Sequence, residues 1–132
     1  MSEKLAPEIN DTNRLYWEGT AVGELRLRHC KACGAKFRFN HGWCPQCGSD
    51  DMGHIVSSGR GVVTNFSVIH VPPYEAYAAE VPYALALVDL AEGVRMMANI
   101  VECDPATVSV GMSVELTFED RGDVKLPQFK PA

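Results

Sequence analysis

The chain has 132 residues and a mass of 14.5 kDa, which is enough for one ordinary domain, or for a small domain with a smaller satellite, and too little for two full enzyme domains. Its 46% hydrophobic and 22% charged residues exclude a disordered or fibrous protein. No apolar run approaches the roughly 20 residues of a membrane-spanning helix, and the first ten residues lack the pattern of a secretory signal. We therefore expect a cytoplasmic protein without membrane contact.

The net charge of −5 is unevenly distributed along the chain. Residues 24–48 carry one acid and five bases and are net +4, which leaves −9 for the remainder. The five bases are Arg26, Arg28, Lys31, Lys36 and Arg38. They form either an ordinary solvated surface or a patch that attracts a phosphate-bearing ligand or an acidic protein face. The acidic remainder argues against a long nucleic-acid track.

The first predicted element is a short helix over residues 10–18. Asp11 or Thr12 is placed to cap it, and Gly19 is placed to end it. Three large residues follow one another within it: Leu15, Tyr16 and Trp17. A helix of this length is marginal alone, so these side chains need a cover, which is either the body of the chain or another subunit.

Four of the five cysteines form the most specific motif, two Cys-x2-Cys-Gly units made of Cys30, Cys33, Cys44 and Cys47. A reducing compartment disfavours disulfides, and a redox pair would normally occur singly at a strand-to-helix junction. The two-residue spacer turns both thiolates toward one point, and the positive φ of Gly34 and Gly48 would aim N–H groups at the sulfurs. Two facing units give the closed tetrahedral site that Zn²⁺ favours, with iron as the alternative.

His29 and His41 lie near these cysteines, and we expect both to lie beside the ligands or at the surface, because four thiolates already complete the site. A closed site leaves no position for water or substrate, so the metal is structural. Residues 24–48 offer a core of only five residues: Leu25, Leu27, Phe37, Phe39 and Trp43. Metal binding, worth about 10–16 kcal/mol in small zinc modules, would fold this segment into a rubredoxin-like zinc ribbon. Alternating apolar and basic residues predict its two short strands, over 25–28 and 37–39.

From residue 55 onward the pattern is that of β-strands, predicted over 62–71, 83–90, 94–101 and 114–118, with a hairpin turn at 89–93. Short connections leave no room for a crossover helix. Such strands best satisfy their edges by closing into a small barrel of the OB type. The predicted fold class is mainly β, with an N-terminal helical arm (1–22), a zinc ribbon (23–53) and an OB-fold barrel with a C-terminal tail (54–132).

Two segments interrupt the strand pattern. Residues 71–82 form an insertion with a short helical turn over 75–80, in which Tyr74 and Tyr77 either line a ligand groove or plug one barrel end. The tail, residues 125–131, has too many prolines for a central strand. We expect it on the surface, anchored by Leu126 and Phe129.

The sequence indicates no catalytic residues. Cys103 is the one cysteine outside the motif, and nothing in the sequence brings His54 or His70, both predicted on strands, to it. A nucleophile elbow, a glycine-rich phosphate loop and a spaced carboxylate pair are also missing from the sequence. Independent catalysis is therefore disfavoured.

The chain resembles the DUF35-type zinc-ribbon/OB-fold proteins, which accompany enzymes of acyl-CoA metabolism. The resemblance spans almost the whole chain and is carried by the two cysteine motifs together with Tyr16-Trp17-Glu18, Gly23-Glu-Leu-Arg-Leu-Arg-His-Cys30, Ser58-Gly-Arg-Gly-Val62, Val81-Pro-Tyr-Ala-Leu85, Glu92-Gly-Val94, Val110-Gly-Met-Ser-Val114 and Leu126-Pro-Gln-Phe129. One departure is Phe39-Asn40, where members usually carry Pro-Arg between the knuckles. It changes the ribbon surface and leaves the metal ligands intact.

The resemblance implies an accessory subunit of a thiolase, acyltransferase or aldolase complex, in which the partner supplies the catalytic residues. Benzoylsuccinyl-CoA thiolase, archaeal acetoacetyl-CoA thiolase, polyketide C-acetyltransferase and steroid side-chain aldolase complexes are the types it suggests. The hypothesis is a hetero-oligomer in which the four cysteines hold zinc and Leu15, Tyr16 and Trp17 dock the partner. A coenzyme A thioester is the implied ligand, and Arg26, Arg28, Lys31, Lys36 and Arg38 would contact CoA phosphates or the partner.

Two alternatives remain at this stage. A ribbon-plus-barrel module can bind single-stranded nucleic acid by aromatic stacking in a positive groove, although the acidic remainder and the few aromatic residues between 61 and 101 disfavour this. With iron in the sulfur cage, the chain would instead resemble a rubredoxin that transfers electrons.

Overall fold

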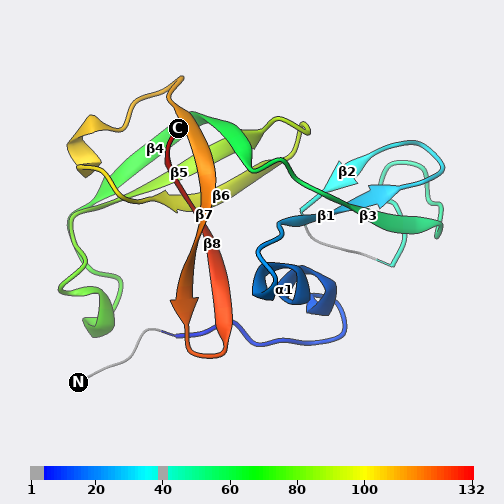
Figure 1. Ribbon diagram of the computed structural model, residues 1–132, viewed down its shortest axis with the longest axis horizontal. Coiled ribbons are helices and arrows are strands. Elements are labelled where there is room, and N and C mark those ends of the chain that lie inside the picture. Colours follow the sequence, from blue (N-terminus) through cyan, green and yellow to red (C-terminus); the bar gives the residue numbers. More distant parts are fainter. Residues whose placement is uncertain (1–4, 39–41) are drawn as a thin grey trace.

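The computed structural model describes residues 5–38 and 42–132, and it confirms the predicted fold class. Figure 1 shows a helix, a small sheet and a barrel side by side. The helix is α1 (Arg14–Ala21), and the antiparallel sheet has the order β2 (Lys36–Phe37), β1 (Arg26–Cys30), β3 (Met52–Val56). Within the described residues, no helix has the length and apolar character needed to cross a membrane.

The barrel is closed in the order β4-β5-β6-β8-β7. Its strands are β4 (Arg60–Ile69), β5 (Tyr83–Leu90), β6 (Arg95–Ile100), β7 (Ser113–Arg121) and β8 (Val124–Pro131). Burial alternates residue by residue along β5, as expected for a strand with one face toward a core. Two short 3-10 turns, η1 (Glu75–Tyr77) and η2 (Pro105–Thr107), lie in the connections. The first is the predicted helical turn in the insertion, shorter than expected.

Helix α1 begins and ends later than predicted. The Asn10 side chain accepts hydrogen bonds from the N–H groups of Thr12 and Asn13, which holds these residues in a turn ahead of the helix. The helix then passes through Gly19, where a Cβ would lie 2.7 Å from the Cδ of Arg26. Gly19 therefore serves the close packing of Arg26 and does not end the helix.

The C-terminal tail is the main correction to the predicted barrel. Residues 124–131 form β8, which pairs with β7 from Arg121↔Val124 to Val114↔Pro131. With β6 it shares one parallel register pair, Ile100↔Phe129. The edge of β8 that faces β6 is largely unpaired, and a strand with such an edge tolerates prolines. The sequence analysis took the same prolines as evidence against a central strand, and that prediction was wrong.

One hydrophobic cluster runs through all three predicted segments. Phe129 of β8 is fully buried, as are Leu25 and Leu27 of the ribbon, and Tyr16 and Trp17 of α1 belong to the same cluster. The ribbon sheet itself extends to Val56. The division at 22/23 and 53/54 stays a prediction, and the shared core shows that the segments pack as neighbours.

Candidate metal centre

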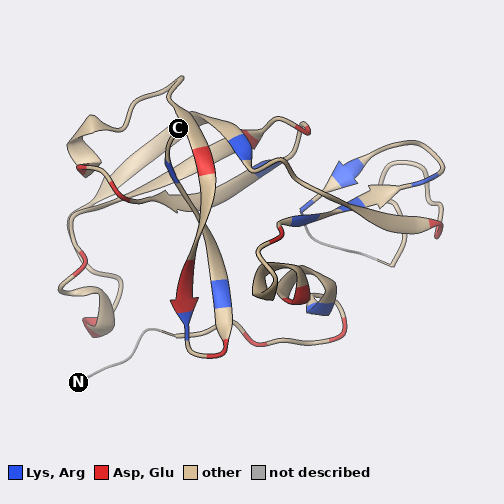
Figure 2. Ribbon diagram, viewed as in Figure 1, with Lys and Arg blue, Asp and Glu red and all other residues tan. Residues whose placement is uncertain are grey.

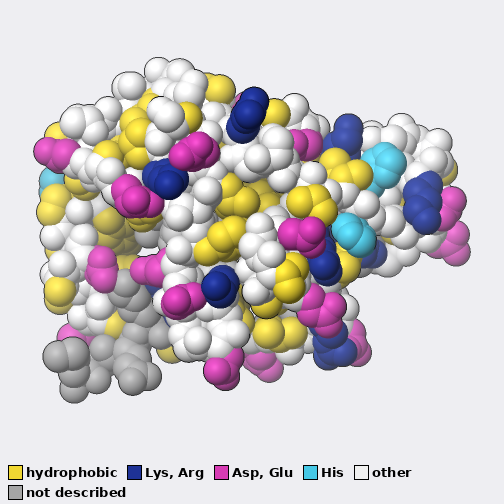
Figure 3. Space-filling model, in the orientation of Figure 1, with side chains coloured by type: hydrophobic (Ala, Val, Ile, Leu, Met, Phe, Trp, Pro, Cys, Tyr) yellow, Lys and Arg dark blue, Asp and Glu magenta, His cyan; other side chains and the backbone are white. Residues whose placement is uncertain are grey.

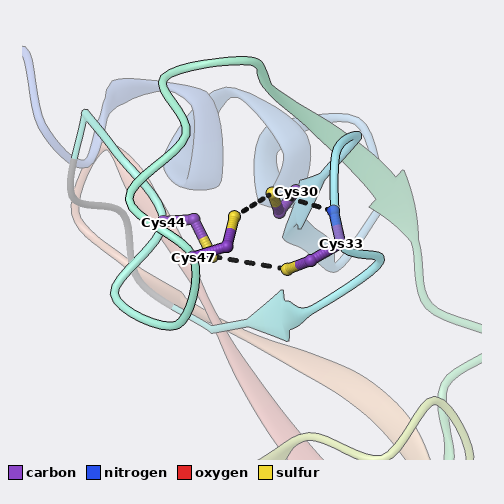
Figure 4. Close-up of side chains that lie close together, drawn as sticks. All are labelled: Cys30, Cys33, Cys44 and Cys47. Atoms are coloured by element: carbon purple, nitrogen blue, oxygen red, sulfur yellow. Dashed lines mark hydrogen bonds between the residues drawn. The ribbon is translucent and has the colours of Figure 1, made fainter.

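The four motif cysteines converge at one point of the ribbon. Figure 4 shows Cys30 and Cys33 facing Cys44 and Cys47 across the loop. All four sulfurs lie within 4.8 Å of one another, and Cys30–Cys47 and Cys33–Cys44 are each 3.6 Å apart. A tetrahedral zinc with Zn–S bonds of about 2.3 Å requires sulfurs about 3.8 Å apart. The geometry and the donor set therefore fit Zn²⁺.

The two knuckles have matching backbone hydrogen bonds. The N–H of Gly34 donates to the Cys30 carbonyl, and the N–H of Gly48 donates to the Cys44 carbonyl, each at 2.8 Å. Both glycines have the predicted positive φ, near 79°. Their N–H groups close the turns, however, and the sulfurs of Cys30 and Cys44 accept instead from the N–H groups of Cys33 and Gln46. The predicted N–H groups directed at the sulfurs are thus present, and they belong to Cys33 and Gln46.

The thiols are prepared unequally for metal binding. Burial opposes ionisation of Cys44, but hydrogen bonds from the N–H groups of Cys47 and Gln46 and from neighbouring thiols outweigh it and lower its pKa to about 7. At Cys33 the N–H of Ala35 favours the thiolate, while burial and the other three thiols disfavour it and raise its pKa to about 12. A divalent cation would relieve this repulsion between thiolates, because metal binding removes the thiol protons.

Two of the four cysteines reach the surface. Cys30 and Cys44 are buried, whereas Cys33 and Cys47 are exposed. His29 is on β1, between Lys36 of β2 and Gly53 of β3, and the group of potential ligands found among the described residues consists of the four cysteines. His41, together with Phe39 and Asn40, falls outside the described residues.

The ribbon has a smaller core of its own than predicted. Leu25 and Leu27 are fully buried, but Trp43 is 54% exposed. The two leucines join the cluster shared with α1 and the barrel. The ribbon is thus fixed by sulfur ligands at one end and by its neighbours at the other.

The predicted partner-docking residues are largely covered by the chain itself. Tyr16 is 4% exposed and Trp17 is 9% exposed, and Leu15 is half-buried. The T-shaped rings of Tyr16 and Trp17 are 5.0 Å apart. Packing on the chain's own body, one of the two predicted alternatives, is therefore realised for the two aromatic residues.

The five ribbon bases separate into two groups. Figure 2 shows basic segments on β1 and β2. Arg26, Arg28 and Arg38 border one small cavity against the start of α1. Lys31 and Lys36 are exposed elsewhere, and the stem of Lys31 lies close to Gly53.

A groove that the sequence did not reveal lies between the helix, the ribbon and the barrel. It has a volume of about 300 Å³, and Arg38 and Arg121 both border it, together with apolar side chains of Trp17, Met97, Leu126 and Pro127. Arg121 donates hydrogen bonds to the Tyr77 hydroxyl at 3.0 Å and to Glu119 at 2.9 Å. Tyr77 also borders the groove, whereas the hydroxyl of Tyr74 accepts the N–H of Leu5. Cys103 is half-buried and packs against the core.

Comparison with known proteins identifies the family. A sequence model described as "ChsH2, rubredoxin-like zinc ribbon domain" matches residues 17–53, and one described as "ChsH2, C-terminal OB-fold domain" matches residues 54–119. The chain belongs to the ChsH2 family of DUF35-type zinc-ribbon/OB-fold proteins. The zinc ribbon of this family and the four clustered sulfurs together support a structural zinc in this ChsH2-type chain.

Curated relatives and a solved structure agree with this membership. A "Probable enoyl-CoA hydratase alpha subunit" of Thermomonospora curvata is 36% identical over 96% of this ChsH2-type chain and 39% of its own length. A "DUF35 domain-containing scaffold protein" of Methanocaldococcus jannaschii is 38% identical over 67% of this chain and 63% of its own length. The chain thus spans about two fifths of the length of the first of these relatives. The structure titled "Ltp2-ChsH2(DUF35) aldolase" is 35% identical, with a TM-score of 0.83 over 96% of this chain and 98% of that one.

Proposed function

We propose that this chain is an accessory, non-catalytic zinc-binding subunit of a thiolase-, acyltransferase- or aldolase-type acyl-CoA enzyme complex. It docks the catalytic partner and helps to shape the binding of the acyl-CoA. The observation that carries the proposal is the match, over nearly its full length, to a chain of the structure titled Ltp2-ChsH2(DUF35) aldolase. A relative named as an alpha subunit of an enoyl-CoA hydratase supports the same class of assembly.

In this proposal the metal centre has an architectural role. Cys30, Cys33, Cys44 and Cys47 hold the zinc, and bound zinc ties the two knuckles together without an open coordination position. The ribbon buries few large side chains of its own, so its fold depends on this link. The partner supplies the groups that react with the thioester.

The docking surface is assigned to the ribbon and the exposed side of α1. The buried side chains of Tyr16 and Trp17 hold α1 in place beneath this surface, and the half-buried Leu15 forms part of the surface itself. Three exposed hydrophobic residues extend the contact: Val22 at 68%, Trp43 at 54% and Val56 at 48% exposure. Figure 3 shows hydrophobic side chains gathered between the barrel and the ribbon, with charged side chains around them. Such a mixed surface is typical of protein interfaces.

The groove between Arg38 and Arg121 is the proposed contact with the acyl-CoA. Its volume of about 300 Å³ lies at the lower end for small-molecule sites, so it would hold only part of a CoA thioester. The apolar side chains of Met97 and Leu126 suit an acyl or pantetheine chain, and Arg38 suits an anionic group near it.

The nucleic-acid alternative finds no support on the barrel. Of the five basic residues of the barrel, four form ion pairs and the fifth, Arg60, is exposed. The pairs are Arg95 with Asp89, Arg121 with Glu119, Lys125 with Asp120 and Lys130 with Glu115. Neutralised side chains do not build the positive groove that a single strand requires.

Co-purification tests the proposal. The chain would be expressed together with a thiolase-like or aldolase-like protein of the same organism, and the mixture analysed by size-exclusion chromatography with light scattering. We expect one hetero-oligomer containing both chains and zinc. Separate elution of the two proteins, each folded, would overturn the proposed function.

A further inference from the structure

Three guanidinium groups converge where the ribbon meets the start of α1. Arg26 and Arg28 extend from β1, and Arg38 follows β2. Arg26 is ion-paired with Glu24 at 3.0 Å. Arg38 lies over the ring of Tyr16, 5.5 Å from its centroid, and 3.4 Å from its hydroxyl. The cluster therefore concentrates more positive charge than Glu24 neutralises.

Arg28 differs from the other two arginines in having a buried nitrogen without a partner. Its Nε is fully buried, and within residues 5–38 and 42–132 neither a hydrogen-bond acceptor nor a carboxylate reaches it. A buried donor without an acceptor destabilises the fold, and more so when it is charged. Burial also lowers the pKa of Arg28, although the side chain as a whole is half-buried.

The space beside Arg28 limits what can fill it. The cavity bordered by the three arginines measures about 10 Å³, which is room for about one water-sized atom. One oxygen of an anionic group fits such a space, and the anionic side chains that a protein partner presents are the carboxylates of aspartate and glutamate. The first turn of α1 borders the cavity, contains no acidic residue and has no side-chain cap, so its N–H groups add partial positive charge.

We propose that this arginine cluster receives an aspartate or glutamate side chain of the catalytic partner. Arg28 would donate to the carboxylate, which matches the planar fork of a guanidinium. The inference rests on the proposed function and names the group that the partner presents to the ribbon. Of the five basic residues predicted to contact CoA or the partner, only the three arginines belong to this cluster, because Lys31 and Lys36 lie outside it.

The experiment uses the hetero-oligomer obtained by co-purification. Affinity of the partner for the full chain would be measured by calorimetry for the wild type, Arg28→Gln and Arg28→Lys. Arg60→Gln, which removes an exposed arginine of the barrel, is the matched loss of one charge. We expect Arg28→Gln to weaken binding at least about tenfold and Arg60→Gln less than about twofold. Arg28→Lys keeps the charge but loses the fork, so it should fall between them.

The outcomes separate this inference from the proposed function. If the wild type binds no partner, the proposed function fails. If Arg28→Gln and Arg28→Lys bind within about twofold of the wild type while retaining zinc, only the carboxylate assignment fails. If amide replacements of the partner's interface acids bind within about twofold while Arg28→Gln still weakens binding, the cluster receives another group and the carboxylate assignment also fails. Should Arg28→Gln fail to fold, Arg28→Lys and replacement of the partner's acidic residues by amides decide the question.

Discussion

Cys30 and Cys44 each anchor one knuckle at the buried side of the sulfur cluster. Each has a carbonyl that accepts the N–H of the following glycine and a sulfur that accepts a backbone N–H. These bonds are local, because they join residues at most four apart. The cysteine spacing alone could therefore predict the cluster.

Replacing Cys44 by serine should release the metal. Cys44→Ser removes one of four sulfur ligands, so the purified chain should contain well below one equivalent of zinc and show a disordered ribbon. Elemental analysis and amide spectra in NMR measure the two effects. Cys103→Ser is the control, because Cys103 packs against the hydrophobic core. This substitution should leave the zinc content unchanged. A Cys44→Ser chain with a full zinc equivalent would refute the ligand assignment.

Glu92 joins the barrel to the linker that follows the ribbon, a contact that the sequence did not reveal. Its carboxylate accepts the Ser57 hydroxyl at 2.6 Å and the Ser58 N–H at 2.9 Å. Burial alone would raise the pKa of Glu92, but these hydrogen bonds outweigh it and lower the pKa below its ordinary value of 4.5. Ser57 and Glu92 are 35 residues apart in the sequence, so the motifs around Ser58 and Glu92 did not indicate that these residues meet.

The pH dependence of stability should reveal this contact. Because the folded-state pKa of Glu92 is lowered, its contribution is complete above the unfolded-state pKa near 4.5 and is lost as the pH falls through the folded value. We expect Glu92→Gln to lower the free energy of unfolding by about 1 kcal/mol at neutral pH, and the difference to shrink at about pH 3. Urea titrations at both pH values measure it, with the exposed Glu115→Gln as control. A difference that is equal at both pH values would argue against the bond.

Strand β8 decides how the barrel closes, although its sequence reads as a surface tail. It pairs with β7 along its length and meets β6 at Phe129, whose carbonyl accepts the N–H of Val101 at 2.7 Å. The proline content of residues 125–131 wrongly predicted a surface tail. The barrel closes because β8 meets β6, which lies far from it in the sequence. Leu126 and Phe129 were nevertheless correctly expected to anchor the segment.

Truncating Phe129 should therefore damage the whole barrel. Phe129 is 0% exposed, and Phe129→Ala should lower the free energy of unfolding by about 3–5 kcal/mol. The neighbouring Lys130 is half-buried on the same strand, and Lys130→Ala should cost less than about 1 kcal/mol. Chemical denaturation of both variants measures the contrast. Equal, small losses would mean that the segment is a surface tail after all.

At the scale of the whole molecule, the barrel, ribbon and helix share one core, with Tyr16 and Trp17 of α1 inside it. The sequence predicted each part, because alternation, cysteine spacing and turn residues are local signals. It left the covering of Tyr16 and Trp17 open and did not reveal the groove between Arg38 and Arg121. Both depend on how separate segments meet, which no local pattern encodes.

We propose that this chain completes an acyl-CoA enzyme without carrying its chemistry. The most direct measurement is thioester turnover by three preparations: the zinc-loaded chain alone, the partner alone, and the purified hetero-oligomer. Full turnover is expected from the hetero-oligomer only, with none from the zinc-loaded chain. Turnover by this chain without the partner, or a partner that is equally active without it, would contradict the claim.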